Sequence, residues 1–371
     1  MLRRAWVTGS VLVLTCGAGL GAAASCASQV DGTGGAGGVT TSSSSSGGQG
    51  GAGGGAGGLG GAGGTGGQAP ACTPSPDAWF AVNELWFGDT DWNGTSSSSA
   101  WQLFGRDVDG VTTQNDLTGH CQLYAGTPAT AANDAPGGID NSWGRNLVPI
   151  MVGLNPAFGA TINGSVAAGD FSLLVRLQGL GAAPTLASVP ALVYGGGALG
   201  HAATFDGQDC WPVTDGTLTD PLDLDTSTLS FPDGALAADV WTSDVAVTIS
   251  LTVPNAGIDF PMKIHQAKLA FTLDADHQGA THGSLSGVLD VNEFLAAMQA
   301  VAGSFDPSLC SGPTWDSLAD QMKQAADILV DGTQDPAMAC NGISIGLGFS
   351  LARDGLGDIV EEPTPSPSPC P

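Results

Sequence analysis

The sequence predicts a mainly β protein: an antiparallel β-sandwich with two helices inserted before the last strand. Several segments alternate apolar with polar or small residues, which is the period of a half-buried strand. Of the 35 acidic residues 31 are Asp, and Asp favours turns whereas Glu favours helices. Two stretches that precede the last alternating segment instead carry apolar residues at helical spacing.

We expect strands at residues 171–177, 245–253, 268–273 and 343–351, where apolar side chains occupy every second position. One face of each strand would therefore pack on a core. The segment 254–257 contains Pro, Asn and Gly, a composition that is typical of a turn. The second face of residues 343–351 carries only Ser and Gly, so we expect another part of the chain to approach that face closely.

Two helices are expected between the third and the fourth of these strands. Asp290 would cap the first helix, and Thr314 would cap the second. Each helix would bury an apolar stripe against the core rather than present it to a partner. The stripes consist of Phe294, Leu295, Met298 and Val301 in the first helix and of Trp315, Leu318, Met322 and Leu329 in the second.

Residues 1–26 have the layout of a secretory signal peptide, because two Arg precede an apolar run and four small residues. The small residues before Cys26 resemble a bacterial lipobox, in which that Cys is lipidated. No Asp follows, since residue 27 is Ala, and the resemblance then implies the outer membrane. The alternative is ordinary cleavage near Ala24, which would leave Cys26 unmodified.

Residues 27–71 form a low-complexity segment of Gly, Ser, Thr and Ala. Such a composition cannot build a core, so we expect a flexible, disordered linker with a reach of roughly 35–40 Å. Residues 72–360 would form the β-sandwich domain, and residues 361–371 would form a tail that is rich in Pro and Ser.

The charge of the chain excludes two classes of protein. Its net charge is −26, from 35 acidic and 9 basic residues. A nucleic-acid-binding protein needs cations to neutralise phosphates, so that class is excluded. Only the N-terminal apolar run is long enough to be considered for a membrane span, which excludes a protein with several spans.

Six cysteines lie in the predicted folded part and its tail: Cys72, Cys121, Cys210, Cys310, Cys340 and Cys370. An exported protein reaches an oxidising compartment, so we expect three disulfides. The connectivity does not follow from the sequence. The pairing that we favour is Cys310–Cys340, Cys121–Cys210 and Cys72–Cys370.

The strongest metal-binding motif lies at residues 89–94, which read Asp-Thr-Asp-Trp-Asn-Gly. Asp89, Asp91 and Asn93 match the first ligands of an EF-hand calcium loop. Ala100 stands where that loop needs a bidentate Glu, so a complete EF-hand is not expected. Ligands from elsewhere would complete a calcium site, or all these residues would form Asx turns without an ion. The candidates for the further ligands are Asp107, Asp109, Asp134 and Asp140.

The sequence resembles uncharacterised bacterial secreted lipoproteins with Gly/Ser-rich tethers. The resemblance rests on residues 101–144, with Asp107-x-Asp109-Gly110 and the Gly-Gly-Ile-Asp-Asn-Ser-Trp-Gly stretch that ends at 144, and on Cys-Asn-Gly-Ile-Ser-Ile-Gly at 340–346. It covers much of residues 80–350 and implies a shared fold and a tethered location. Because these lipoproteins have no assigned activity, it implies no catalytic residue.

Three patterns bear on catalysis. Residues 342–346 read Gly-x-Ser-x-Gly, but Ser344 lies within a predicted strand and no His follows it, so an α/β-hydrolase is not expected. Two Asp and two His at 274–282 are interpreted as a hairpin tip rather than a metal site. Most of seven Trp are expected in the core rather than on a sugar-stacking surface: Trp79, Trp86, Trp92, Trp101, Trp143, Trp211 and Trp241.

The leading hypothesis is a non-enzymatic, tethered cell-surface lipoprotein that serves adhesion or envelope binding and is stabilised by calcium. Its partners would be the membrane, through the lipid anchor, and a surface glycan or protein. One alternative is a secreted hydrolase that acts on polysaccharide through carboxylates from distant strands. Another is a structural envelope component without a ligand. The location would be the bacterial outer membrane or cell surface, or the exterior if Cys26 is not lipidated.

Overall fold

The computed structural model describes residues 72–255, 258–304, 306–364 and 367–370. The predicted signal peptide, Cys26 and the predicted linker lie outside these residues. Within the described ranges, no helix has both the length and the apolarity that crossing a membrane requires.

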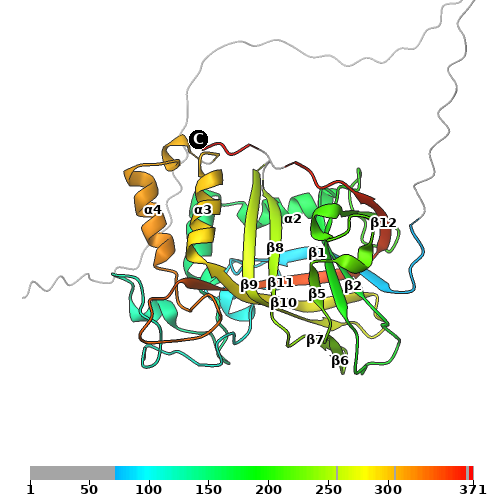
Figure 1. Cartoon of the computed structure of the whole chain (residues 1–371), viewed down its shortest axis with the longest axis horizontal. Helices are drawn as coiled ribbons and strands as arrows, with labels where there is room; N and C mark the ends of the chain where they lie inside the picture. The colour runs from blue at the N-terminus through cyan, green and yellow to red at the C-terminus, as the bar shows by residue number, and fades with distance from the viewer. Residues whose placement is uncertain (1–71, 256–257, 305, 365–366, 371) are drawn as a thin grey trace, which may run out of the picture. The chain divides into compact units, whose positions relative to one another are not determined.

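A mixed sheet of 12 strands organises the described part of the chain (Figure 1). The strand order is β12-β4-β3-β2-β1-β11-β10-β9-β7-β6, with β5 beside β3 and β8 beside β9. Neighbouring strands are antiparallel, except that β12 runs parallel to β4. The strands are β1 (Ala78–Trp86), β2 (Ser172–Leu177), β3 (Ala191–Gly196), β4 (Cys210–Thr214), β5 (Leu229–Phe231), β6 (Ala235–Ala237), β7 (Val240–Thr242), β8 (Val247–Asn255), β9 (Ile258–Leu273), β10 (Gly279–Asp290), β11 (Gly342–Arg353) and β12 (Gly355–Val360).

The mainly β class is confirmed, but the antiparallel sandwich is wrong, because the strands form one curled sheet. Strand β9 explains the difference. It is 16 residues long, and its first part pairs with β8 while its second part pairs with β10. Register shifts interrupt its ladder with β10, and such bulges bend a strand and increase its twist. In Figure 1 the ends of β8 and β9 rise across β10 and β11. A sandwich would build these two layers from separate strands, but here the bent strand β9 takes part in both.

The four alternating segments are all strands. They correspond to β2, β8, the second part of β9 and β11. Of the predicted turn after β8, residues 256–257 lie outside the described residues. The close approach to the Ser and Gly face of β11 is also confirmed, because a Cβ atom built on Gly346 would lie 2.5 Å from the carbonyl oxygen of Phe104.

Both predicted helices are present, but the described part contains two further α-helices, and the strand that follows the predicted pair, β11, is not the last, because β12 comes after it. Asp290 caps α3 as predicted, because its carboxylate accepts hydrogen bonds from the backbone N–H of Asn292 and Glu293. Thr314 does not cap α4: Gly312 occupies the N-cap and Pro313 the first position, where a missing N–H costs nothing. The helices are α1 (Val148–Leu154), α2 (Phe158–Ala168), α3 (Val291–Ala302) and α4 (Pro313–Lys323), with the π-helical turn η3 (Trp143–Leu147) and the short 3₁₀ turns η1 (Ala100–Leu103), η2 (Ala129–Ala132), η4 (Asp215–Thr217), η5 (Leu224–Thr226) and η6 (Pro307–Leu309).

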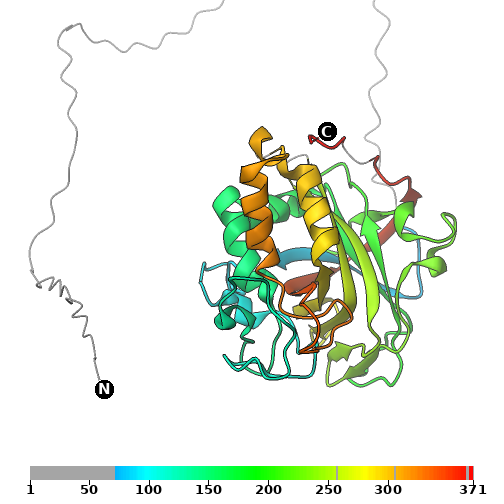
Figure 2. The same ribbon diagram turned by 60° about the vertical axis from the view of Figure 1, so that its left-hand side comes forward.

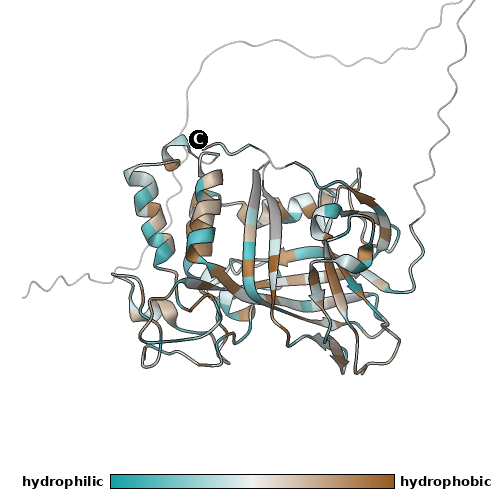
Figure 3. Ribbon diagram, in the orientation of Figure 1, coloured by the Kyte–Doolittle hydropathy of each residue, from teal (hydrophilic) through white to brown (hydrophobic). Residues whose placement is uncertain are grey.

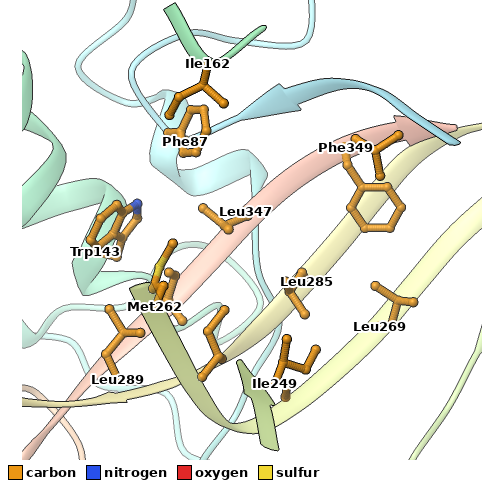
Figure 4. Close-up of a cluster of buried hydrophobic side chains, with 14 of the residues drawn as sticks. Phe87, Trp143, Ile162, Ile249, Met262, Leu269, Leu285, Leu289, Leu347 and Phe349 are labelled. Carbon is orange, nitrogen blue, oxygen red and sulfur yellow. The ribbon is translucent and has the colours of Figure 1, made fainter. Parts of the chain in front are cut away.

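The main core lies between the sheet and the helices. Helices α3 and α4 lie side by side (Figure 2) and carry alternating polar and apolar bands (Figure 3). Their apolar residues join those of α2 and of β11, and Figure 4 shows part of this cluster. A smaller cluster around Trp79, Tyr194 and Trp211 covers the opposite face near β4. Of the seven Trp named above, all but Trp92 are buried, which confirms that most of them belong to the core.

Three disulfides are present among the described cysteines, but each predicted pairing is wrong. The pairs are Cys72–Cys210, Cys121–Cys340 and Cys310–Cys370. Backbone pairing explains the first two, because residue 73 pairs with residue 356 beside β4, and residue 122 pairs with residue 339. The third disulfide joins the described end of the tail to the region after α3, where Ser368 donates a hydrogen bond to the carbonyl oxygen of Ala300 and Cys370 bonds to Cys310.

Candidate metal centre

Two long connections cover the Ser and Gly face of β11. We call residues 88–142 and 324–341 the loop layer; they lie together below α3 and α4 in Figure 1. Asn141 fastens this layer to the strand. Its side-chain amide donates to the carbonyl oxygens of Trp101, Phe104 and Gly346 at 3.0–3.1 Å. Its Oδ1 atom accepts from the backbone N–H of Gly144 and Gly346.

A second fastening involves Ser344 in the middle of β11. Its hydroxyl donates to Oδ2 of Asp327 at 2.6 Å and accepts from the backbone N–H of Ser142 at 2.8 Å. The other carboxylate oxygen of Asp327 accepts from the backbone N–H of Ser344. Ser344 is fully buried and lies within a strand, as expected, rather than on a nucleophile elbow. It therefore has a structural role.

Asp107, Asp109 and Asp140 converge in the loop layer. One oxygen of each carboxylate lies within 4.8 Å of an oxygen of the other two. Asp140 is only 3% exposed, whereas Asp107 lies at the surface. Oxygen ligands of Ca²⁺ lie about 2.3–2.6 Å from the ion, so two of them are at most about 5 Å apart. The three carboxylates are therefore close enough to share one ion.

Hydrogen bonds hold these carboxylates in place. Oδ2 of Asp140 accepts from the backbone N–H of Val108 at 2.7 Å. Oδ1 of Asp109 accepts from the backbone N–H of Val111, and its Oδ2 accepts from the side-chain amide of Gln334. The donors are neutral, so they orient the carboxylates without compensating their charge.

Gly138 allows the close packing around Asp107. A Cβ atom at this position would lie 3.0 Å from Oδ2 of Asp107 and 3.0 Å from the hydroxyl oxygen of Thr112. Its φ of +78° is also one that other residues rarely adopt. The hydroxyl of Thr112 and the carboxylate of Asp107 therefore both border Gly138.

Burial raises the pKa values of the carboxyl groups in this region. It raises the pKa of Asp134 to about 6 and that of Asp327 to about 7. The pKa of Asp140 is also raised, first by burial and then by the negative charges of Asp109 and Asp327. Taking a carboxylate out of water is unfavourable unless a cation or a proton compensates it.

No Lys, Arg or His among the described residues forms an ion pair with the carboxyl groups of Asp107, Asp109, Asp134, Asp140 and Asp327. Arg145 is nearby, but its guanidinium donates to the carbonyl oxygen of Asn133 and lies 5.0 Å from the centre of the Trp101 ring. The carboxyl groups therefore form an acidic cluster without a paired side-chain cation. We call Asp107, Asp109, Asp134, Asp140 and Asp327 the acidic cluster.

The 89–94 loop lies apart from this cluster. Oδ1 of Asp91 accepts from the backbone N–H of Asn93 and Thr95, both at 2.9 Å, which is the geometry of an Asx turn. Asn93 is exposed. Asp89 faces Gly159 in the first turn of α2, with its Oδ2 atom 3.4 Å from a Cβ built on that glycine. The structure does not bring these three residues to the acidic cluster.

The polar segment 274–282 comprises the turn between β9 and β10, at 274–278, and the first residues of β10. His277 lies within hydrogen-bonding distance of the carbonyl oxygen of Gly181 and of Oδ1 of Asp239. His282 instead packs against the ring of Trp92. The predicted hairpin tip is thus confirmed for residues 274–278, whereas His282 lies within β10.

Asp327 was not predicted as part of the site. The predicted stripe placed Leu329 in the second helix, which is wrong, because α4 ends at Lys323. Asp327 thus lies beyond the helix, and nothing in the neighbouring sequence distinguishes it from a surface Asp. Only the pairing of residue 328 with residue 342 brings it to β11.

A cleft of about 310 Å³, lined mostly by polar residues, borders the acidic cluster. Thr112, Asp116, His120 and Gln334 are among the residues that line it. Gln334 belongs to both features, because its side-chain amide also contacts Asp109. The position of the Asp109 side chain therefore affects that of Gln334, and so one wall of the cleft.

Comparisons of this chain with protein-family models, with curated proteins and with solved structures find no match.

Proposed function

We propose that Asp107, Asp109 and Asp140 bind a calcium ion, and that the chain is a tethered, non-enzymatic binding module at the cell surface. The observation that carries the proposal is the convergence of three carboxylates within 4.8 Å of one another. All the donors are oxygen atoms, which suits a hard cation such as Ca²⁺. The export and the tether remain those inferred from the N-terminal sequence.

The electrostatics support this assignment. The acidic cluster contains five carboxyl groups without a side-chain ion pair among the described residues. A divalent cation would offset their repulsion and lower the pKa values that burial raises. It would also hold the loop at 107–110 against residue 140, which is next to Asn141.

The ligand that we propose is a surface glycan, bound in the polar cleft beside the cluster. Its lining offers hydroxyl, amide, imidazole and carboxylate groups, which are the partners that sugar hydroxyls require. Calcium would act indirectly by ordering Asp109 and therefore Gln334, whose amide donates to Asp109 at 2.7 Å.

Calorimetric titration of the purified full chain with calcium tests the metal site. We expect one site, its loss in Asp140→Asn, and its retention in the matched control Asp91→Asn. If Asp140→Asn and Asp91→Asn bind calcium equally well, the ion lies at another site. Magnesium should bind more weakly, because it tolerates less deviation from octahedral geometry.

A glycan panel probed in calcium and in EDTA tests the ligand. Binding that requires calcium and that Gln334→Ala removes would support the proposal. Cleavage of a glycan would favour the polysaccharide hydrolase instead, and absence of any binding would favour a structural envelope component.

A further inference from the structure

A second concave feature lies on the other side of β11, within the curl of the sheet. It is a cleft of about 800 Å³ between α3, the β8–β9 pair and the ends of β2 and β3. Ligand sites for small molecules have volumes of about 300–1,000 Å³. The cleft is therefore large enough for an organic ligand.

The cleft continues into an apolar cavity. Phe171, Leu173 and Met262 line both the cleft and an inner cavity of about 60 Å³. Every other side chain around the inner cavity is also apolar, and Figure 4 shows Met262 and Leu285 among the side chains of this region. Small apolar cavities stay dry and accept hydrocarbon groups. The inner end is thus suited to an alkyl group.

The opening of the cleft is polar and acidic. Asp170, Glu293 and Glu362 line it together with one cation, Lys263. Lys263 already pairs with Glu293 at 2.8 Å, and His265 contacts the other oxygen of Glu293 at the same distance. Asp170 and Glu362 are exposed, so the opening keeps a net negative charge.

Three consecutive glycines keep one wall of the cleft free of side chains. Residues 195–197 lie at the end of β3 and line the cleft. A Cβ atom on Gly195 would lie 2.6 Å from the hydroxyl oxygen of Thr214, and one on Gly196 would lie 3.0 Å from the carbonyl oxygen of Ser172. Larger residues would therefore not fit at these two positions, and this wall of the cleft consists of backbone.

We propose that this cleft binds a single-chain amphiphile whose alkyl chain lies along the apolar lining of the cleft with its end in the inner cavity, and whose uncharged or cationic head group lies at the opening. The apolar inner end selects the chain, and the acidic opening disfavours an anionic head. The net charge of −26 adds a long-range repulsion of anions. The residues involved differ from those of the calcium site, so the two proposals stand independently.

The test uses the purified full chain and the neutral fluorescent dye N-phenyl-1-naphthylamine. We expect dye binding that dodecylamine and dodecanol displace at concentrations about tenfold lower than dodecanoate does, since the three compounds share their chain and differ in head-group charge. Equal displacement by all three would overturn the role of the acidic opening.

Two variants locate the site. Leu173→Trp fills the passage between the cleft and the cavity and should weaken dye binding about tenfold or more; Leu103→Trp, at a position 47% exposed and outside the cleft, is the matched control. The double variant Asp170→Lys with Glu362→Lys changes only exposed residues and should reverse the preference toward dodecanoate. Unchanged dye binding in Leu173→Trp, together with an unchanged preference in the double variant, would overturn the proposal.

Other occupants have distinct outcomes. Dye binding that appears only after removal of residues 1–71 would show that the chain's own N-terminal part occupies the cleft. A concentration-dependent dimer that Leu173→Trp abolishes would show that a second copy does so. Either result would replace the proposed amphiphile.

Discussion

Two Asp-rich regions of the chain use the same side chain in opposite ways. In the 89–94 loop, Asp91 matches a calcium-ligand spacing, yet its carboxylate accepts two backbone N–H groups and closes a turn at the surface. In the acidic cluster, Asp140 comes from a later part of the same connection as Asp107 and Asp109, and it is buried beside them. The carboxylate of Asp91 is accessible to water, whereas that of Asp140 is not. The comparison teaches that burial of converging charges, rather than local spacing, creates the need for a cation.

The largest expected effect is a loss of stability in Asn141→Ala that Asn93→Ala does not show. Asn141→Ala removes the five hydrogen bonds of this side chain, two within the loop layer and three to Gly144 and Gly346, and leaves buried carbonyl and N–H groups without partners. We expect the free energy of unfolding to fall by about 3–5 kcal/mol. Asn93→Ala, at an exposed position, should change it by less than about 0.5 kcal/mol. Denaturant titration checks both values, and equal losses would show that the loop layer is not fastened through Asn141.

The next effect is the pH dependence without calcium. Burial raises the pKa of Asp134 to about 6 and that of Asp327 to about 7, so protonation favours the folded state. Their contribution to stability is complete below the pKa of an unfolded Asp, near 4, and is lost as the pH rises through 6 to 7. In EDTA the free energy of unfolding should therefore fall between pH 5 and 8, by on the order of 2 kcal/mol.

Asp354 offers the internal control for that experiment. Its pKa is also raised, to about 7 and chiefly by burial, but it lies in the smaller cluster, where its carboxylate accepts from the indole N–H of Trp211. Calcium should cancel the part of the pH dependence that comes from the acidic cluster and leave the part from Asp354. A pH dependence that calcium does not reduce would contradict the assignment of the ion to the cluster.

The smallest effect concerns the turn itself. Asp91→Ala removes two hydrogen bonds to backbone N–H groups at an accessible loop, which should cost about 0.5–1.5 kcal/mol. Because no ion is assigned to this loop, the loss should be the same in calcium and in EDTA. Thermal melts in both buffers measure it, and a loss confined to the calcium buffer would return the metal site to residues 89–94.

Features that depend on neighbouring residues could be predicted from the sequence. The alternation in 343–351 indicated β11, and its Ser and Gly face indicated the close approach that Gly346 makes to Phe104. Asp290 was also predicted correctly as a cap, because a cap bonds to N–H groups two and three residues away. Each of these inferences needs only the local chain.

Features that depend on tertiary contacts could not be predicted in this way. The disulfides follow from strand neighbours, such as the pairing that places Cys121 beside Cys340, and no spacing rule reveals those neighbours. The sequence indicated three of the candidate ligands, Asp107, Asp109 and Asp140. It did not predict that they would lie apart from Asp91. Asp327 belongs to the acidic cluster only because the neighbouring residue 328 pairs with residue 342 of β11.

Thermal melts of the full chain, Asp140→Asn and Asp91→Asn in EDTA and in calcium at pH 8 test the central claim most directly. Calcium at about 100 times its dissociation constant should raise the melting temperature of the full chain and of Asp91→Asn by about 5 °C. It should leave that of Asp140→Asn unchanged. An equal rise in all three proteins, or no rise in any, would contradict a calcium ion at Asp107, Asp109 and Asp140.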